Sequence, residues 1–187
     1  MKEKEIKPMK KGLWIKGAVL SIIMVVMLSG NVVGEEGNYE KILELKDEIV
    51  KIQNQGELGF RNFTLCSKII TFGHYVALPE PKVKVGTEEI LIYTEPANHF
   101  TNTQGGRYEL WLTLDMIVLA ENGEVLLEKT DAVSPHFNTA TPILDIFFPL
   151  TIYVSAVPVG KYTFKAVLHD VLREATATKT VDFEIVE

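Results

Sequence analysis

The chain has 187 residues, of which 47% are hydrophobic and 24% charged, so it is long and apolar enough to bury one sizeable core. Without its basic first 34 residues it carries 13 basic and 23 acidic groups, a formal charge of −10. Such an acidic surface repels nucleic acid and anionic lipid, so we expect neither as a partner of the folded part.

Residues 1–34 are predicted to be a signal peptide or an N-terminal membrane anchor. Six lysines precede the apolar run 18–28, and Val32 and Gly34 suit cleavage before Glu35. The longer segment from Gly17 to Gly34, which contains this run, is just long enough for an uncleaved, tilted membrane anchor. Both interpretations place the rest of the chain outside the cytoplasm, secreted or anchored by this apolar segment.

Residues 35–56 are predicted to contain one amphipathic helix. A short polar joint, residues 34–37, leads to Asn38 as the N-cap, and Gly56 suits the position just past the C-terminus. We expect the apolar side to pack on the domain that follows; a self-associating coil is the alternative, although two heptads are few for one. The apolar side consists of Tyr39, Ile42, Leu45, Ile49 and Ile52.

Residues 57–187 change to a period of two and predict a mainly β domain. The expected fold is an antiparallel immunoglobulin-like sandwich of about seven or eight short strands. Residues 89–94 are apolar on both sides, as in a central strand, whereas Pro149 marks an edge, a bulge or a strand that switches sheets.

The strongest hairpin signal is Asn122-Gly123 between two alternating strands. Val125 and Leu127 are expected to return on the core side after the turn. The side chains before the turn that are expected to line the core are Tyr108, Leu110, Leu112, Leu114, Met116 and Val118.

Pro158 and Gly160 predict a tight turn that enters a strand with Tyr162 near its start. This arrangement resembles the tyrosine corner of immunoglobulin-like sandwiches, in which the hydroxyl bonds back to the backbone. An ordinary core tyrosine is the alternative. In the closing strand, Lys179 falls in the apolar row, where it either reaches past the core or marks a bulge.

The order of these elements resembles the immunoglobulin-like and fibronectin type III extracellular modules, over roughly residues 60–187. More narrowly, three segments are similar to a group of uncharacterised secreted prokaryotic proteins with a phenylalanine-glycine-x-tyrosine segment. This chain departs from that group by an inserted His99 and by Val85-Gly86 in place of proline-glycine. The resemblance implies a fold and a compartment, and no activity. The three segments are Phe72-Gly73-His74-Tyr75, Ile90 to Phe100, and Gly106-Arg107-Tyr108.

Two long irregular stretches, residues 95–107 and 130–141, are the expected binding loops, because binding concentrates on loops carried by a rigid sandwich. Phe100 and Phe137 stand in polar surroundings, as contacts with protein or glycan often do, but each could equally plug the end of the core. The predicted binding residues are Asn98, His99, Phe100, Asn102, Phe137 and Asn138.

The same loops contain two histidines that could form a metal site. His99 and His136 could meet at one end of the sandwich and hold a metal with Glu95 or Asp131. Two such histidines are usually solvated loop residues, so the sequence predicts no metal and no cofactor.

Catalytic motifs are absent from the sequence. It has no Gly-x-Ser-x-Gly, no His-Glu-x-x-His and no phosphate-binding loop, so no enzyme is predicted. The single Cys66 lies in an alternating segment and is expected to be a buried apolar residue. Asn62 begins Asn-Phe-Thr, a candidate acceptor for a glycan.

The predicted function is a non-catalytic extracytoplasmic binding or structural module, whose partner is a protein or glycan at the cell surface. The alternative is a pilin-like subunit of a surface filament, because an apolar segment, a helix and a β-domain follow in that order. Gly30, Gly34 and Gly37 argue against one continuous helix there. A secreted enzyme or inhibitor is a third possibility, which no motif supports.

Overall fold

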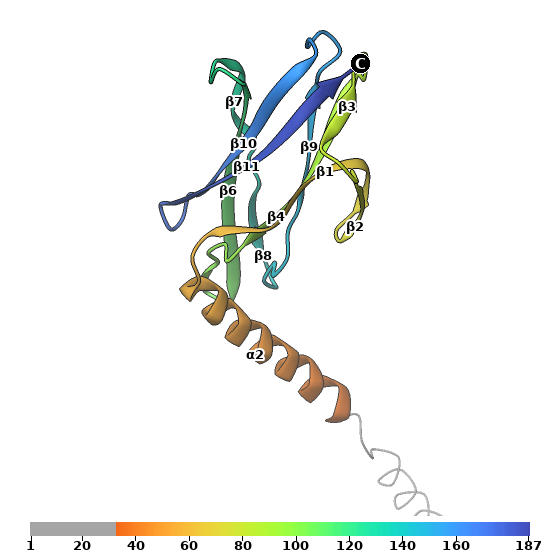
Figure 1. Cartoon of the computed structure of the whole chain (residues 1–187). Coiled ribbons are helices and arrows are strands. Elements are labelled where there is room, and N and C mark those ends of the chain that lie inside the picture. The colour runs from red at the N-terminus through yellow and green to blue at the C-terminus, as the bar shows by residue number, and fades with distance from the viewer. Residues whose placement is uncertain (1–32) are drawn as a thin grey trace, which may run out of the picture. The chain divides into compact units, whose positions relative to one another are not determined.

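The computed structural model describes residues 33–187, in which one helix is followed by eleven strands in two sheets (Figure 1). The chain divides into two units, Met1–Ile42 and Leu43–Glu187. The predicted targeting segment, residues 1–34, lies outside the described residues except for its last two, and it stays a prediction. Within the described range, no helix combines the length and the hydropathy needed to cross a bilayer.

The helix α2, Val33–Gln55, differs from the predicted helix at both ends. It begins before Asn38 and includes residues 34–37, because isolated glycines weaken a helix without ending it. Gly56 follows its last residue but does not have the left-handed φ that a C′ glycine adopts. A Cβ at Gly56 would lie 2.4 Å from Cγ of Asn98. Position 56 therefore requires glycine because the side chain of Asn98 leaves no room for a larger residue.

The prediction that the apolar stripe of the helix packs on the domain is wrong. Leu45, Ile49 and Ile52 are 45%, 46% and 70% exposed, and among the side chains described for residues 37–55 Val50 is the buried one. The last turns of α2 instead contact the strands through polar groups. Tyr108 Oη, for example, donates to Asp47 Oδ1 at 2.5 Å.

The smaller sheet has the order β2-β1-β4-β9, and all its pairs are antiparallel. β4 lies in its interior, as its sequence predicts, and residues 92–96 are buried. Pro149 lies in the outer strand β9, which confirms the edge interpretation. The four strands are β1 Gly59–Thr71, β2 His74–Ala77, β4 Glu89–Ala97 and β9 Phe148–Tyr153.

The larger sheet has the order β3-β11-β10-β6-β5, and β7 and β8 also pair with β6. β3 runs parallel to β11, so the sheet is mixed, and the prediction of a purely antiparallel fold needs this correction. Its strands are β3 Lys82–Lys84, β5 Asn102–Gln104, β6 Arg107–Ala120, β7 Val125–Val133, β8 His136–Thr139, β10 Gly160–Asp170 and β11 Ala175–Val186.

The predicted count of seven or eight strands is too low. The additional strands β3, β5 and β8 have three or four residues, and β5 and β8 form in the two stretches that the sequence predicts as irregular. A segment of that length is too short to show an alternating pattern. What makes it a strand is the neighbour that it pairs with.

The core lies between the two sheets. All six core residues predicted for β6 are buried. Phe164 of β10 has no exposed surface and stacks on Phe63 of β1 with ring centroids 5.9 Å apart. Lys179 pairs with Ala166 in an unbroken register and is exposed, so it reaches past the core and marks no bulge.

The prediction that the strand after the hairpin returns to the core is wrong. Val125 and Leu127 of β7 are 52% and 43% exposed. Leu127 pairs with Val118, whose side chain is buried, but the register between β6 and β7 shifts at the next pair, Leu119 with Val125, and Leu127 remains uncovered. Residues 125–131 are exposed throughout.

The tyrosine corner is confirmed, since Tyr162 Oη donates to the carbonyl of Pro158 at 2.7 Å. Because a net hydrogen bond contributes about 1 kcal/mol, Tyr162→Phe is expected to lower the free energy of unfolding by about 1 kcal/mol in chemical denaturation. Tyr153→Phe is the matched control and should change nothing, since Tyr153 is 78% exposed. Equal stabilities of the Tyr162→Phe variant and the wild type would show that the hydroxyl contributes nothing.

Candidate functional site

The solvent-facing side of β6 carries a cluster of aromatic and polar side chains. Tyr108, Leu110 and Leu112 face the core, so the residues between them face solvent. The short strands β5 and β8 both pair with this part of β6 and bring in residues from the two predicted loops. We call this surface the Trp111 face; it consists of Asn102, Arg107, Glu109, Trp111, His136 and Asn138.

At its centre, the rings of Trp111 and His136 stack with centroids 4.5 Å apart and an interplanar angle of 15°. His136 Nε2 donates to Glu109 Oε1 at 2.8 Å, and Asn102 Nδ2 donates to the other carboxylate oxygen at 3.4 Å. The hydrogen bond from His136 and then that from Asn102 hold the pKa of Glu109 below its usual range. The carboxylate of Glu109 therefore fixes the positions of its two neighbours.

Arg107 lies at one end of the Trp111 face. Its guanidinium donates to the side-chain oxygen of Asn138 through Nε and to the backbone carbonyl of Asn138 through Nη2, at 2.6 Å. Both residues are exposed. A guanidinium has more N–H donors than these two bonds use, so an oriented cation remains available to a partner.

Sequence reasoning named Asn102 and Asn138 but missed Arg107, Glu109, Trp111 and His136 as members of one surface. The feature of the sequence that could have identified this surface is a tryptophan, Trp111, on the solvent side of an alternating strand. Phe137, also predicted, lies on β8 between His136 and Asn138 and is 39% exposed. The structure therefore brings three of the six predicted binding residues to one end of the larger sheet.

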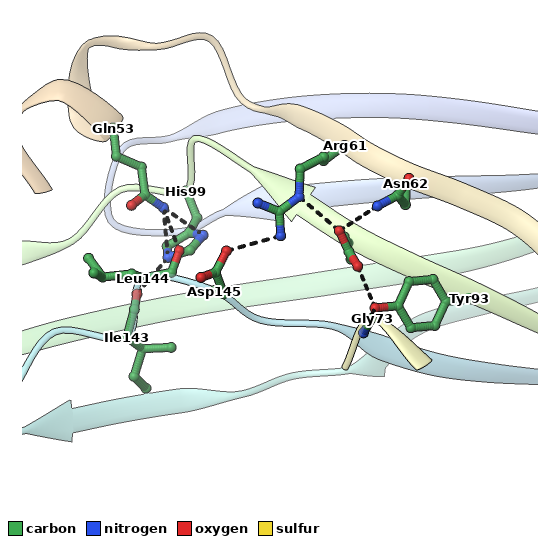
Figure 2. A network of polar contacts seen from close by, with 10 residues as sticks. Gln53, Arg61, Asn62, Gly73, Tyr93, His99, Ile143, Leu144 and Asp145 are labelled. Carbon is green, nitrogen blue, oxygen red and sulfur yellow. Dashed lines mark hydrogen bonds and ion pairs between the residues drawn. The ribbon is translucent and has the colours of Figure 1, made fainter. Parts of the chain in front are cut away.

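The other three predicted residues lie apart from the Trp111 face. His99 is 1% exposed, and its Nε2 donates to the carbonyl of Ile143 at 2.9 Å (Figure 2). Nδ1 lies 3.1 Å from the side-chain nitrogen of Gln53 on α2 and accepts a hydrogen bond from it. Burial lowers the pKa of His99, so the ring is neutral at physiological pH. It connects the helix to the segment that precedes β9.

Asn98 and Phe100 take part in the same junction. Asn98 has a positive φ of 55°, and its side chain donates to the carbonyl of Glu57 at 2.9 Å. The backbone N–H of Phe100 donates to the buried carboxylate of Asp170 at 2.6 Å. Arg173 closes the junction by donating to the carbonyls of Asn98 at 2.7 Å and of Gly56, just past the helix, at 2.8 Å.

A second network, which joins Arg61, Asn62 and Tyr93 (Figure 2), surrounds Glu95, which is 3% exposed. Its carboxylate accepts hydrogen bonds from Arg61 Nε at 2.8 Å, from Asn62 Nδ2 at 2.6 Å and from the hydroxyl of Tyr93. Burial raises the pKa of Glu95, but these three bonds together outweigh it and hold the pKa below its usual range. Burial and then the bond to Glu95 raise the pKa of Tyr93 to about 12.

The Glu95 network has the character of a structural support. The backbone N–H of Gly73 donates to the Tyr93 oxygen at 2.6 Å, so the turn between β1 and β2 is tied to β4. A carboxylate with this many fixed donors has little freedom to exchange a proton with a substrate. The nitrogen of Asn62 that donates here is also the atom to which the predicted glycan would be attached.

A third polar group crosses the outer side of the larger sheet. His169 Nε2 donates to Asp115 Oδ2 at 2.9 Å, and Thr176 Oγ1 lies 3.3 Å from His169 Nδ1. The order of carboxylate, imidazole and hydroxyl is that of a hydrolase triad. Thr176, however, is exposed, whereas such a triad works in a site that excludes water. We interpret the three side chains as a polar contact across neighbouring strands.

No group of three or more His, Cys, Asp or Glu side chains in the described range could hold a metal ion. His99 and His136 were the two metal ligands considered from the sequence. His99 bonds to Gln53 and Ile143, whereas His136 contacts Trp111 and Glu109, so the two do not meet. Cys66 is 3% exposed, which confirms that it is buried, and burial raises the pKa of its thiol.

A groove of about 440 Å³ lies near the other end of β6, away from the Trp111 face. Leu119, Ala120 and Phe183 supply apolar lining. Its lysines are already paired, Lys161 with Glu121 at 3.8 Å and Lys82 with Glu80 at 2.7 Å. The lysines of the groove are therefore not free to bind an anionic ligand, and Asp182 and Glu184 add negative charge to its lining.

No known protein family matches the chain, and no curated protein sequence matches it. Among solved structures, it is similar to part of Bacteroides uniformis β-glucuronidase 2, with 10% identity and a TM-score of 0.36 over 69% of this chain and 14% of that one. It is also similar to the Pseudomonas fluorescens alkylpurine DNA glycosylase AlkC, with 8% identity and a TM-score of 0.41 over 91% and 43%.

A family 123 glycoside hydrolase from Clostridium perfringens is similar at 12% identity and a TM-score of 0.36, over 57% of this chain and 23% of that one. The chain thus spans less than half the length of each of these proteins. These remote likenesses assign the chain to no family.

Proposed function

We propose that this chain is a non-catalytic extracytoplasmic binding module that holds a protein partner at the cell surface through the Trp111 face. The observation that carries the proposal is the exposed side of β6, where Trp111 and Arg107 lie among polar side chains. Tryptophan and arginine are the residues most enriched among those that dominate binding energy at protein interfaces.

The charge of the Trp111 face also supports a binding role. The chain from residue 35 onwards carries a formal −10, yet here Arg107 balances Glu109 and no other acidic side chain is present. A locally neutral surface lets a partner approach without the repulsion that the rest of the chain exerts.

Preorganisation favours the same surface. The side chains of the Trp111 face are held in place by their own hydrogen bonds and by the stacked rings. Fixing flexible side chains on association costs about 0.5–1.5 kcal/mol each, and side chains that are already fixed avoid much of that cost.

The proposal of a non-catalytic module is supported by the state of the buried titratable groups. Glu95 accepts from three donors, and His99 is bonded at both ring nitrogens.

We propose the immunoglobulin-like class for the domain because two packed sheets are combined with the Tyr162 corner. The extracytoplasmic location rests on residues 1–34 alone.

A pilin-like filament subunit is the second candidate, and one observation favours it. α2 runs through Gly34 and Gly37, two of the glycines that argue against a continuous helix in the sequence. N-terminal sequencing of the protein from cells separates the two candidates. Cleavage near Gly34 fits a secreted module, and cleavage near Gly17 fits a filament subunit.

A photo-crosslinking amino acid placed at Gln104 or at Phe72 tests the binding module in the cells that produce it. Both residues are exposed, but only Gln104, which pairs with Arg107, lies on the same side of the sheet as the Trp111 face. We expect a discrete protein adduct from position 104 and none from position 72. Equal yields at the two positions, or a yield at position 72 alone, would contradict the proposal; an adduct with carbohydrate would replace the protein partner by a glycan.

A further inference from the structure

The guanidinium of Arg107 is held along one of its donor edges. Nε and Nη2, which together form the side edge of the group, donate to the side-chain oxygen and to the backbone carbonyl of Asn138. Arg107 directly follows the turn Gly105-Gly106, in which both glycines have a positive φ, so its backbone is fixed as well. A guanidinium has five N–H groups, so both of those on Nη1 and the second one on Nη2 remain. These groups form the end edge of the guanidinium, which Asn138 does not occupy.

Arg107 differs in this respect from the other two arginines of the chain. Arg61 pairs with two carboxylates, and Arg173 pairs with Asp170. Within residues 33–187, no carboxylate forms an ion pair with Arg107, and the residue is exposed. An arginine that two hydrogen bonds hold in place, and that no carboxylate of the described chain neutralises, is suited to bind an anion of another molecule.

We propose that the end edge of Arg107 binds an aspartate or glutamate side chain of the protein partner. This inference rests on the proposed function, since Arg107 belongs to the Trp111 face, and it adds the chemistry of the partner. One N–H of Nη1 and one of Nη2 lie parallel and match the two oxygens of a carboxylate. Both bonds are charge-assisted, and such bonds are roughly twice as strong as those between neutral groups. The bonds to Asn138 orient this edge before the partner arrives.

The surroundings of Arg107 favour a single carboxylate with apolar neighbours. Glu109 follows two residues later on the same side of β6, and the chain from residue 35 onwards carries a formal −10, so a run of acidic residues would be repelled. Trp111 lies on the same side about 13 Å along the strand, which rises about 3.3 Å per residue, and offers a contact to an apolar side chain. A C-terminal carboxylate is typically bound by backbone N–H groups, whereas the donors here belong to a side chain.

Neutralising the partner's carboxylates tests the proposal in a titration of the labelled full chain onto intact cells of the producing strain. One batch of cells is untreated, and in the other the surface carboxylates are converted to amides with a carbodiimide and glycinamide. Arg107→Gln should bind untreated cells about tenfold or more weakly than the wild type, and the two should bind the amidated cells equally weakly. Lys68→Gln is the matched control, because it removes an exposed cation from β1 in the smaller sheet and should bind each batch as the wild type does.

Arg107→Lys is a second variant that keeps the positive charge and loses the parallel pair of donors. Its affinity for untreated cells should lie between those of the wild type and Arg107→Gln. The melting temperature of each variant checks that it is folded. An Arg107→Lys variant that binds as the wild type does would show that the charge alone is recognised and would overturn the paired contact with a carboxylate.

The outcomes separate this inference from the proposed function. If Trp111→Ala binds as the wild type does, the Trp111 face is not the binding surface and both proposals fail. If Trp111→Ala binds weakly but Arg107→Gln binds as the wild type does, or is weakened by the same factor on both batches of cells, only the carboxylate contact is overturned. Protease treatment of the cells should abolish binding of the wild type. Binding that survives protease but not amidation would place the carboxylate on a glycan and overturn the assignment to an acidic side chain of a protein.

Discussion

Replacing Glu95 by alanine is expected to lower the free energy of unfolding by about 3 kcal/mol. The carboxylate is 3% exposed and accepts hydrogen bonds from Arg61, Asn62 and Tyr93. Arg61 is half-exposed and still reaches Asp145, so it can be solvated again. Tyr93 has no exposed surface, and its hydroxyl would lose the group to which it donates. The hydroxyl oxygen would still accept from Gly73, but a buried O–H without an acceptor is the largest part of the expected loss.

Two control variants isolate this effect in chemical denaturation. Glu95→Gln keeps the shape and an acceptor oxygen, so the loss should be smaller than for alanine. Glu89→Ala removes an exposed glutamate from the same strand and should leave the free energy of unfolding unchanged. If Glu95→Ala unfolded at the same denaturant concentration as Glu89→Ala, the network would contribute nothing to stability.

The pH dependence of stability follows from the same carboxylate. The pKa of Glu95 is lower in the folded chain than its ordinary value. A group of this kind contributes its stability above its unfolded-state pKa, and the contribution is lost as the pH falls through the folded-state pKa. The wild type should therefore lose stability on acidification more steeply than Glu95→Gln. Parallel pH profiles of the two would show that Glu95 is not responsible.

Local signals account for the parts of the fold that the sequence predicts correctly. The alternation along β6, the Asn122-Gly123 turn and the Tyr162 corner all depend on residues close together in the chain. The exposed stripe of α2 shows the limit of such signals. The periodicity of the apolar residues indicates a helix. Which side of the helix contacts the strands depends on polar partners such as Tyr108, which lies 61 residues after Asp47 in the sequence.

The candidate site was predictable only in part, because distant segments build it. Asn102 and Asn138 come from stretches that the sequence predicts as irregular, and each becomes a strand residue by pairing with Glu109. His99 was expected on a binding loop, yet Gln53, 46 residues earlier, and Ile143, 44 residues later, enclose it. A single sequence gives no sign of these contacts.

Trp111→Ala is expected to weaken binding to the partner at least tenfold, since an aromatic anchor at the centre of an interface contributes about 2 kcal/mol or more. The half-buried ring of Trp111 lies on the solvent side of β6, so its loss should affect folding far less than binding. Tyr153→Ala is the matched control, because Tyr153 is an aromatic residue that is 78% exposed on the other sheet.

The most direct measurement is a titration of the labelled wild type, Trp111→Ala and Tyr153→Ala onto intact cells of the producing strain, with the melting temperature of each variant as a check on folding. The Trp111 face predicts saturable binding of the wild type and of Tyr153→Ala, and at least tenfold weaker binding of a folded Trp111→Ala. Binding of Trp111→Ala with the affinity of the wild type would contradict the assignment of this face as the binding surface.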